Sequence, residues 1–164
     1  MKIENLRELL VDELRDLYSA ETQLTKALPK VAKHASDTQL KQAIEHHLKE
    51  TEGQVRRLEQ IFERLHEKPK GKTCNGMKGL IEEADERISD GGEPQTLDAG
   101  LIADAQRVEH YEISAYGSAR TFANLLHESE IARLLEETLK EEKNADATLN
   151  RIAESINVEA KAAA

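Results

Sequence analysis

The sequence predicts an all-α fold, a bundle of four long helices with one long crossover between the second and the third. Three observations support this. Leu, Ala, Glu and Lys dominate the 164 residues, aromatic residues make up 3% and Trp is absent, a composition that favours helix over strand. Four segments repeat apolar residues at the helical period. A stretch rich in Gly and Lys lies between Pro69 and Pro94, and such stretches typically separate helices.

The first two helices are expected at residues 3–34 and 38–66. Their apolar stripes contain, in order, Leu10, Leu14, Leu17, Leu24 and Leu28, then Leu40, Ile44, Leu58, Ile61 and Leu65. The string SDTQ at 36–39 has the pattern of a capping box and predicts the start of the second helix. Pro29 lies within the first stripe, so a kink or local break is expected there.

The crossover is expected at about residues 67–96, with a short helix near 77–89. The last two long helices are expected at 97–125 and 129–156, and residues 157–164 as a frayed tail. Their stripes contain Ile102, Ala105, Tyr116 and Ala123, then Ile131, Leu135, Leu149 and Ile152. Two antiparallel hairpins joined by a long connection give the ferritin-like topology. The whole chain, 1–164, is interpreted as one such domain.

Charge and cysteine content restrict the partners and the compartment. The net charge is −9, so the surface should repel nucleic acid and anionic lipid, which argues against both as partners. Cys74 is the single cysteine and cannot form an intrachain disulfide. With no signal-like start, this indicates a reducing compartment, the cytoplasm. No apolar run approaches about 18 residues, so no membrane span is expected.

Acids interrupt the buried stripe of each long helix near its middle, when residues are placed at about 100° intervals. From the first helix to the last, the interrupting residues are Glu21; His47 and Glu50; Glu109 and Glu112; Glu142 and Asp146. In an antiparallel bundle the middles of the helices meet at one level. The acids should therefore converge inside the bundle.

Buried carboxylates without partners are costly, so these acids either take up protons or bind cations. Lys and Arg lie mainly on the outer faces, which makes two divalent ions the predicted partners. Carboxylate ligation with one histidine suits iron or manganese better than zinc. The usual Glu-x-x-His pairs of such bundles do not occur among these interrupting residues, and the second helix offers His47-x-x-Glu50 instead. Simpler interpretations stay open: a satisfied core histidine for His47, and a hydrogen-bond acceptor behind the ligands for Asp146.

Several strings resemble a known family. They are DLYSAETQLTKALPK, HLKETEGQVRRLEQIF, GKTCNGMKGLIEEA, LIADAQRVEHYEISAYG and LLEETLKEEKNAD. Together they look like the bacterial YciE/YciF stress-associated ferritin-like proteins over about residues 4–155. The resemblance implies a ferritin-like bundle, a homodimer and a rubrerythrin-like dinuclear centre. In that pattern Glu109 and Glu112 match the paired glutamates of the third helix, and Glu21 matches the acid of the first.

The sequence leaves three functions open. The first is redox chemistry of the metal pair with peroxide or O2, with electrons from an outside donor because one cysteine cannot build a Cys₄ iron site. The second is iron handling, although storage needs a closed shell that a dimer does not form. The third is a stress-linked binding or scaffold protein whose metal site is structural or vestigial.

Overall fold

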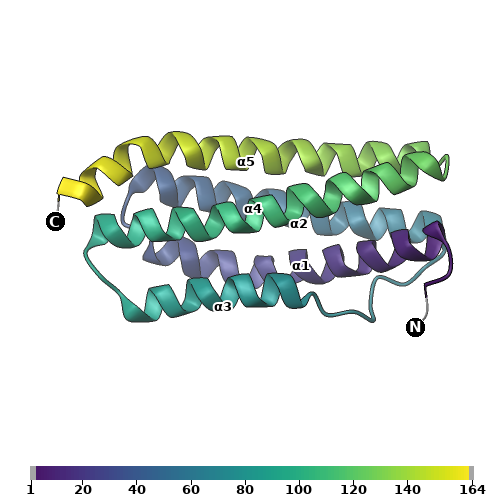
Figure 1. Cartoon of the computed structure of the whole chain (residues 1–164), viewed down its shortest axis with the longest axis horizontal. Coiled ribbons are helices and arrows are strands. Elements are labelled where there is room, and N and C mark those ends of the chain that lie inside the picture. The colour runs from purple at the N-terminus through teal and green to yellow at the C-terminus, as the bar shows by residue number, and fades with distance from the viewer. Residues whose placement is uncertain (1–2, 163–164) are drawn as a thin grey trace.

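The computed structural model describes residues 3–162, which form five α-helices. They are α1 (Leu6–His34), α2 (Thr38–Leu65), α3 (Asn75–Asp90), α4 (Pro94–Leu125) and α5 (Ser129–Ala162). The four long helices lie side by side, with α1 packed on α2 and α4 on α5 (Figure 1). Contacts of α1 with α4 and of α2 with α5 close the bundle. The predicted ferritin-like bundle with a long crossover is confirmed.

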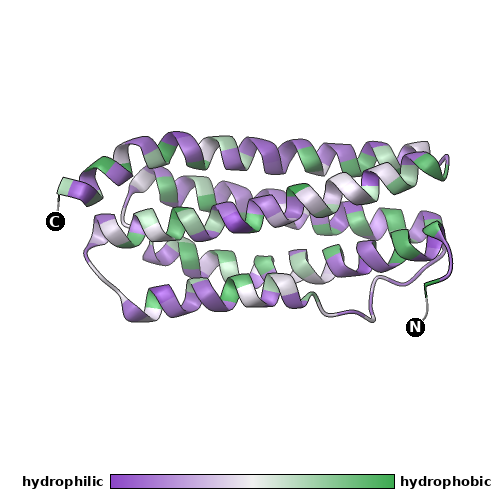
Figure 2. Ribbon diagram, viewed as in Figure 1, coloured by the Kyte–Doolittle hydropathy of each residue, from purple (hydrophilic) through white to green (hydrophobic). Residues whose placement is uncertain are grey.

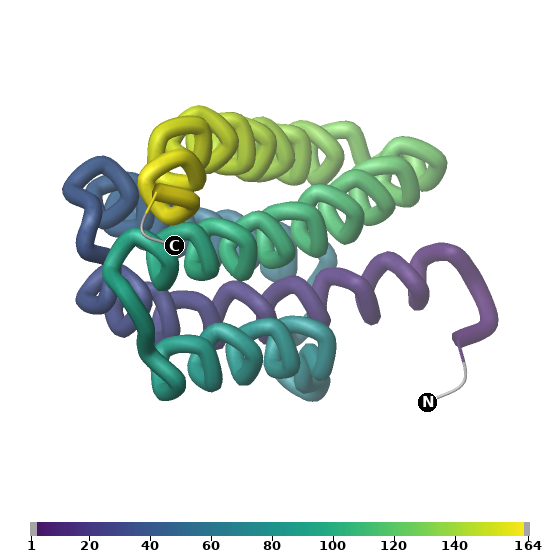
Figure 3. The backbone as a smooth tube through the Cα atoms, turned by 60° about the vertical axis from the view of Figure 1, so that its left-hand side comes forward, coloured from purple at the N-terminus to yellow at the C-terminus, as the bar shows by residue number. Residues whose placement is uncertain are grey.

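The crossover helix α3 lies outside the four-helix bundle, against α4 and α1 (Figure 3). It begins at Asn75, two residues before the predicted start, where the Cys74 Sγ accepts a hydrogen bond from the Met77 backbone N–H at 3.3 Å. Cys74 itself is buried and not in a disulfide. The extra helix therefore covers the side of the bundle formed by α1 and α4.

The helix ends follow local capping. Helix α2 starts at Thr38 as predicted, but the cap is Asp37, whose Oδ1 accepts from the Leu40 N–H at 2.8 Å. The buried Asp98 of α4 accepts from the backbone N–H groups of Ser36 and Asp37 at 2.9 and 2.7 Å. This carboxylate ties the α1–α2 turn to the start of the second hairpin.

Three further features of the long helices differ from the sequence expectation. Helix α1 runs through Pro29 without interruption, so the expected local break is absent. Helix α4 begins at Pro94 rather than at 97, since proline suits the first helical position, where no N–H is needed. Helix α5 continues to Ala162, and residues 157–162 are helical rather than frayed. The end of the tail, 163–164, lies outside the described residues.

Hydrophobic and hydrophilic residues alternate along every helix, as expected for helices with one buried face (Figure 2). The buried apolar residues divide into two clusters. One contains Leu10–Leu17 of α1 with residues 58–65 of α2, and the other contains Leu24–Ala32 with Leu40 and Ile44. Helices α4 and α5 divide in the same way, at residues 109–112 and 142. The core is therefore split by a layer of buried polar residues at mid-height.

No helix within residues 3–162 is long and apolar enough to cross a lipid bilayer.

Candidate metal centre

The polar layer is built from all four long helices. Glu21, Glu112 and Glu142 have no exposed surface, Glu109 is 2% exposed and His47 is 6% exposed. Thr51 and Gln54 of α2 are also fully buried at this level. The helical phase of each segment puts these side chains on its inward face, and the antiparallel arrangement brings the faces to one height.

Four of these residues form a group with the spacing of a metal site. His47, Glu109, Glu112 and Glu142 each offer one ligand atom, and these atoms lie within 4.8 Å of one another. The His47 Nε2 is 3.3 Å from Glu109 Oε1 and 3.8 Å from Glu142 Oε2. The convergence expected from the sequence thus holds for these side chains of α2, α4 and α5.

Glu21 completes the layer from α1. Its Oε1 accepts a hydrogen bond from the Tyr116 hydroxyl of α4 at 2.5 Å. Both residues are fully buried. The second carboxylate oxygen of Glu21 has no hydrogen-bond partner among the described residues. One oxygen is therefore held by a neutral donor, and the other is available.

Glu50 and Asp146 lie outside the group of four. The Glu50 side chain is 24% exposed and lies 3.3 Å from His46 Nε2 and 3.7 Å from His47 Nδ1. The Asp146 carboxylate accepts from Gln106 Nε2 at 3.0 Å and lies 3.3 Å from His110 Nε2. Glu50 is thus at the rim of the polar layer, whereas Asp146 belongs to a separate polar cluster between α4 and α5. Their roles as ligands stay predictions.

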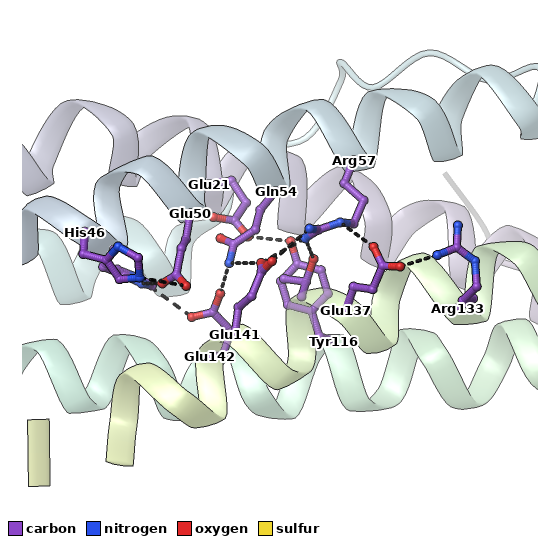
Figure 4. A network of polar contacts seen from close by, with 12 residues as sticks. Glu21, His46, Glu50, Gln54, Arg57, Tyr116, Arg133, Glu137, Glu141 and Glu142 are labelled. Atoms are coloured by element: carbon purple, nitrogen blue, oxygen red, sulfur yellow. Dashed lines mark hydrogen bonds and ion pairs between the residues drawn. The ribbon is translucent and has the colours of Figure 1, made fainter. Parts of the chain in front are cut away.

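A chain of polar contacts leads from Glu142 to the surface (Figure 4). Gln54 Nε2 donates to Glu142 Oε1, and it also donates to Glu141 Oε2 at 3.0 Å. Arg57 in turn donates to both oxygens of Glu141, at 2.9 and 3.0 Å, and its Nε lies 3.4 Å from Glu137 Oε2. Glu142 is therefore oriented by a neutral amide that is itself held by a partly buried ion pair.

Sequence reasoning missed the roles of Arg57 and Glu141 in this chain. Gln54 carried a detectable signal, because it lies seven residues after His47 and so on the same helical face. Arg57 and Glu141 carried none, since both lie at the edge of the stripe and resemble ordinary surface charges.

Burial and mutual repulsion shift the acid–base equilibria of the layer. Burial, reinforced by the charge of Glu142, raises the pKa of Glu21 to about 8. Burial also raises the pKa of Glu109 and of Glu112 well above the ordinary value. Burial alone would lower the pKa of His47, but the carboxylate of Glu109 and its neighbours raise it to about 10. The layer without a cation therefore holds protons that exposed carboxyl groups would have lost.

The chemistry of the donors fits a bound cation. Buried atoms without a hydrogen-bond partner among residues 3–162 include Glu21 Oε2, Glu109 Oε2, Glu142 Oε2, both Glu112 oxygens and both His47 nitrogens. No Lys or Arg of this part of the chain forms an ion pair with these four glutamates. Buried polar atoms are nearly always partnered, so a cluster of open oxygens around an imidazole is what a metal ion would satisfy. Oxygen-rich ligation favours iron or manganese over zinc.

The fold and this layer define a class, ferritin-like helical bundles with a buried His/Glu cluster. The chain belongs to the family described as "Domain of unknown function (DUF892)", whose model matches residues 5–163. Protein YciF of Escherichia coli (strain K12) is 45% identical over 154 residues, 93% of each chain. The resemblance to the YciE/YciF proteins is thereby confirmed.

Solved structures agree with this assignment. The crystal structure of the E. coli stress protein YciF matches with a TM-score of 0.91 and 44% identity, over 94% of this chain and 98% of that one. YcfI from Rhodopseudomonas palustris matches with a TM-score of 0.88 and 44% identity, over 91% and 95%. A Xanthomonas campestris protein, 22% identical with a TM-score of 0.76 over 94% of each chain, shares the fold.

Proposed function

We propose that the chain binds two divalent ions, iron or manganese, in the polar layer and uses them in stress-related redox chemistry with peroxide or O2. One observation carries the proposal: three helices place buried carboxylate oxygens without hydrogen-bond partners at one level, and the fourth places the His47 imidazole among them. The match to a bacterial stress protein supports the stress-related part.

The proposed ligands divide by position. His47, Glu109, Glu112 and Glu142 are the residues whose donor atoms already lie together, and Glu21 would join from α1 through its free oxygen. For the two predicted ligands outside the group, binding requires a change. Glu50 would exchange its histidine contacts for the metal, and Asp146 its hydrogen bond with Gln106.

Bound iron or manganese would supply the electron exchange with peroxide or O2. The protein's own part is to hold the ligands and exclude water. The Gln54 amide fixes Glu142 and the Tyr116 hydroxyl fixes Glu21. Electrons would come from an outside donor, because the single cysteine cannot hold a second iron centre.

Metal analysis followed by an activity assay tests this function. Protein purified without added metal is analysed for iron and manganese, stripped with chelator, and titrated with Fe(II) or Mn(II) under argon. The loaded protein is then assayed for peroxide consumption with a reductant present. Two ions per chain and metal-dependent consumption are expected. Absence of binding in folded protein would rule the proposal out.

The alternative is a stress-linked scaffold or binding protein with a structural or vestigial metal site. The relative YcfI, described as a candidate structural protein, favours it, as does the lack of a Glu-x-x-His pair in the buried polar layer. Two bound ions that raise the melting temperature without any peroxide consumption would support this alternative. Iron handling would instead appear as Fe(II) oxidation followed by retention of more than two ions per chain.

The proposal includes a homodimer in the cytoplasm. The dimer rests on the family resemblance, and the compartment rests on the single free cysteine. Sedimentation at micromolar concentration should give twice the mass of the chain, and a monomer would contradict this part of the proposal.

A further inference from the structure

A cavity lies directly beside the polar layer. It has a volume of about 220 Å³ and is lined by residues of all five helices, with His47, Glu50 and Glu109 of the polar layer among its polar residues. Most of the wall is alkyl, including Leu28, Ile44, Leu80, Ile81, Val108 and Leu149. The crossover helix α3 supplies Leu80, Ile81 and Ala84, so the fifth helix is what closes the cavity on that side.

Charges around the cavity are mostly neutralised by partners within the chain. Asp85 pairs with Lys30 at 2.7 Å, and Asp104 pairs with Arg87 and Arg107 at 2.5 Å each. What remains for an occupant is a mostly apolar wall, with the uncharged Asn144 and Thr148 on α5 and with the polar group of His47, Glu50 and Glu109. There, Glu109 Oε2 and the His47 nitrogens lack hydrogen-bond partners among the described residues.

We infer that this cavity binds a small neutral organic molecule, of about the size of one substituted ring, with a hydroxyl group toward His47 and Glu109. Apolar cavities of about 150 Å³ stay dry and bind benzene, and this one is larger. An ionised ligand would lose its hydration against alkyl walls, and the His47 imidazole is already paired with the Glu109 carboxylate at 3.3 Å. In the metal-free protein, a hydroxyl group would donate to Glu109 Oε2, which has no hydrogen-bond partner among the described residues.

The inference deepens the proposed function and rests on it in one respect: an occupant here would lie next to the metal pair and so be its organic substrate or reductant. The binding itself does not need the metal. Binding and metal uptake can therefore be measured separately on the same protein.

The probes are p-cresol, toluene and p-toluate, titrated calorimetrically into metal-free protein, with methyl NMR to locate the site. We expect p-cresol to bind more tightly than toluene, with shifts at Leu28, Ile44 and Leu149, and p-toluate to bind at least about tenfold more weakly than p-cresol. Equal binding of the anion, shifts elsewhere, or no binding of either neutral probe would overturn the inference.

Two neighbouring alanines of α4 give a matched pair of variants. Ala105 lines the cavity, whereas Ala103 is exposed. Ala105→Leu should weaken p-cresol binding at least about tenfold because the added side chain occupies the cavity, and Ala103→Leu should leave binding unchanged. Equal effects of the two variants would overturn the inference. Ala84→Leu on α3, which also lines the cavity, replaces Ala105→Leu if the latter does not fold.

The two failures are distinguishable. If p-cresol binds as expected but Fe(II) and Mn(II) do not, the cavity assignment stands and the proposed function fails. If the ions bind but neither neutral probe does, the cavity assignment fails, and the proposed metal binding stands.

Discussion

At the scale of single residues, the neutral side chains explain how so much charge is kept inside the bundle. Gln54 has two N–H donors on one nitrogen, and it uses them on Glu141 and Glu142 at once. Tyr116 gives its hydroxyl proton to Glu21. In Glu142 and Glu21 this satisfies one oxygen and leaves the other without a hydrogen-bond partner. A carboxylate held on one side and free on the other is already oriented for a cation.

Glu142→Ala should reduce metal binding more than His47→Ala. The first change removes the ligand that α5 contributes to the group of four and leaves only the more distant Asp146. The second leaves an oxygen-only site that iron and manganese accept. Anaerobic titration with Mn(II), with content measured after gel filtration, provides the comparison. Glu154→Ala, an exposed change on the same helix, is the control, and full metal content in Glu142→Ala would defeat the assignment.

At the scale of elements, the start of α3 is held against α4 by a tight contact. A Cβ added at Gly76 would lie 2.7 Å from Tyr111 Cε2. The Tyr111 ring has little freedom to move, because its hydroxyl donates to Asp16 at 2.6 Å and lies 2.9 Å from Cys74 Sγ. The glycine thus sets how closely the crossover helix approaches the bundle.

Two glycines of α3 should therefore respond oppositely to alanine. Gly76→Ala should lower the free energy of unfolding by about 1–3 kcal/mol, the usual cost of overpacking. Gly79→Ala should raise it by about 0.5–1 kcal/mol, because alanine is the better helix former and nothing lies within 4 Å of the new Cβ. Urea denaturation of both variants measures the difference. If Gly76→Ala were more stable than the wild type, the Tyr111 ring must move to make room for the added Cβ.

The helices and their buried acids were predictable because both follow from the helical period. That period places Glu21, His47, Glu109 and Glu142 on inward faces whatever the loops do. The direction of Asp146 was not predictable, since it depends on a contact with Gln106 across two helices. The partial exposure of Glu50 follows from its place at the stripe's edge. The cavity could not be foreseen, because it arises where α3 docks, and the sequence pattern gives no docking position.

At the scale of the whole molecule, the stability of the metal-free protein should fall as the pH rises from about 5 to about 8. The folded-state pKa of Glu21 is raised to about 8 and that of His47 to about 10. The folded state therefore binds more protons than the unfolded state above the unfolded values near 4.5 and 6.5. The stability that these two groups contribute is fully present below their unfolded-state pKa values. It is lost as the pH rises toward their folded-state pKa values.

Metal should reverse this trend, because ions bind the deprotonated ligands and stabilise the folded form. Melting curves of chelator-treated and Mn(II)-loaded protein across the same pH range test both statements. The melting temperature of the first sample should fall with pH, and the gap between the two samples should widen. Parallel curves would mean that the polar layer does not titrate with folding.

The division of the core into two apolar clusters has a consequence for amide hydrogen exchange. In most helices the ends open first and the centre last. Here each long helix is anchored at two places, and its middle carries acids that repel one another. In the metal-free protein, amides near Glu21, Thr51, Glu112 and Glu142 should exchange faster than those in either apolar cluster. Addition of Mn(II) should slow the exchange of these central amides most, and hydrogen-exchange mass spectrometry can resolve the difference. Bound metal would then make the two halves of the bundle unfold as one cooperative unit.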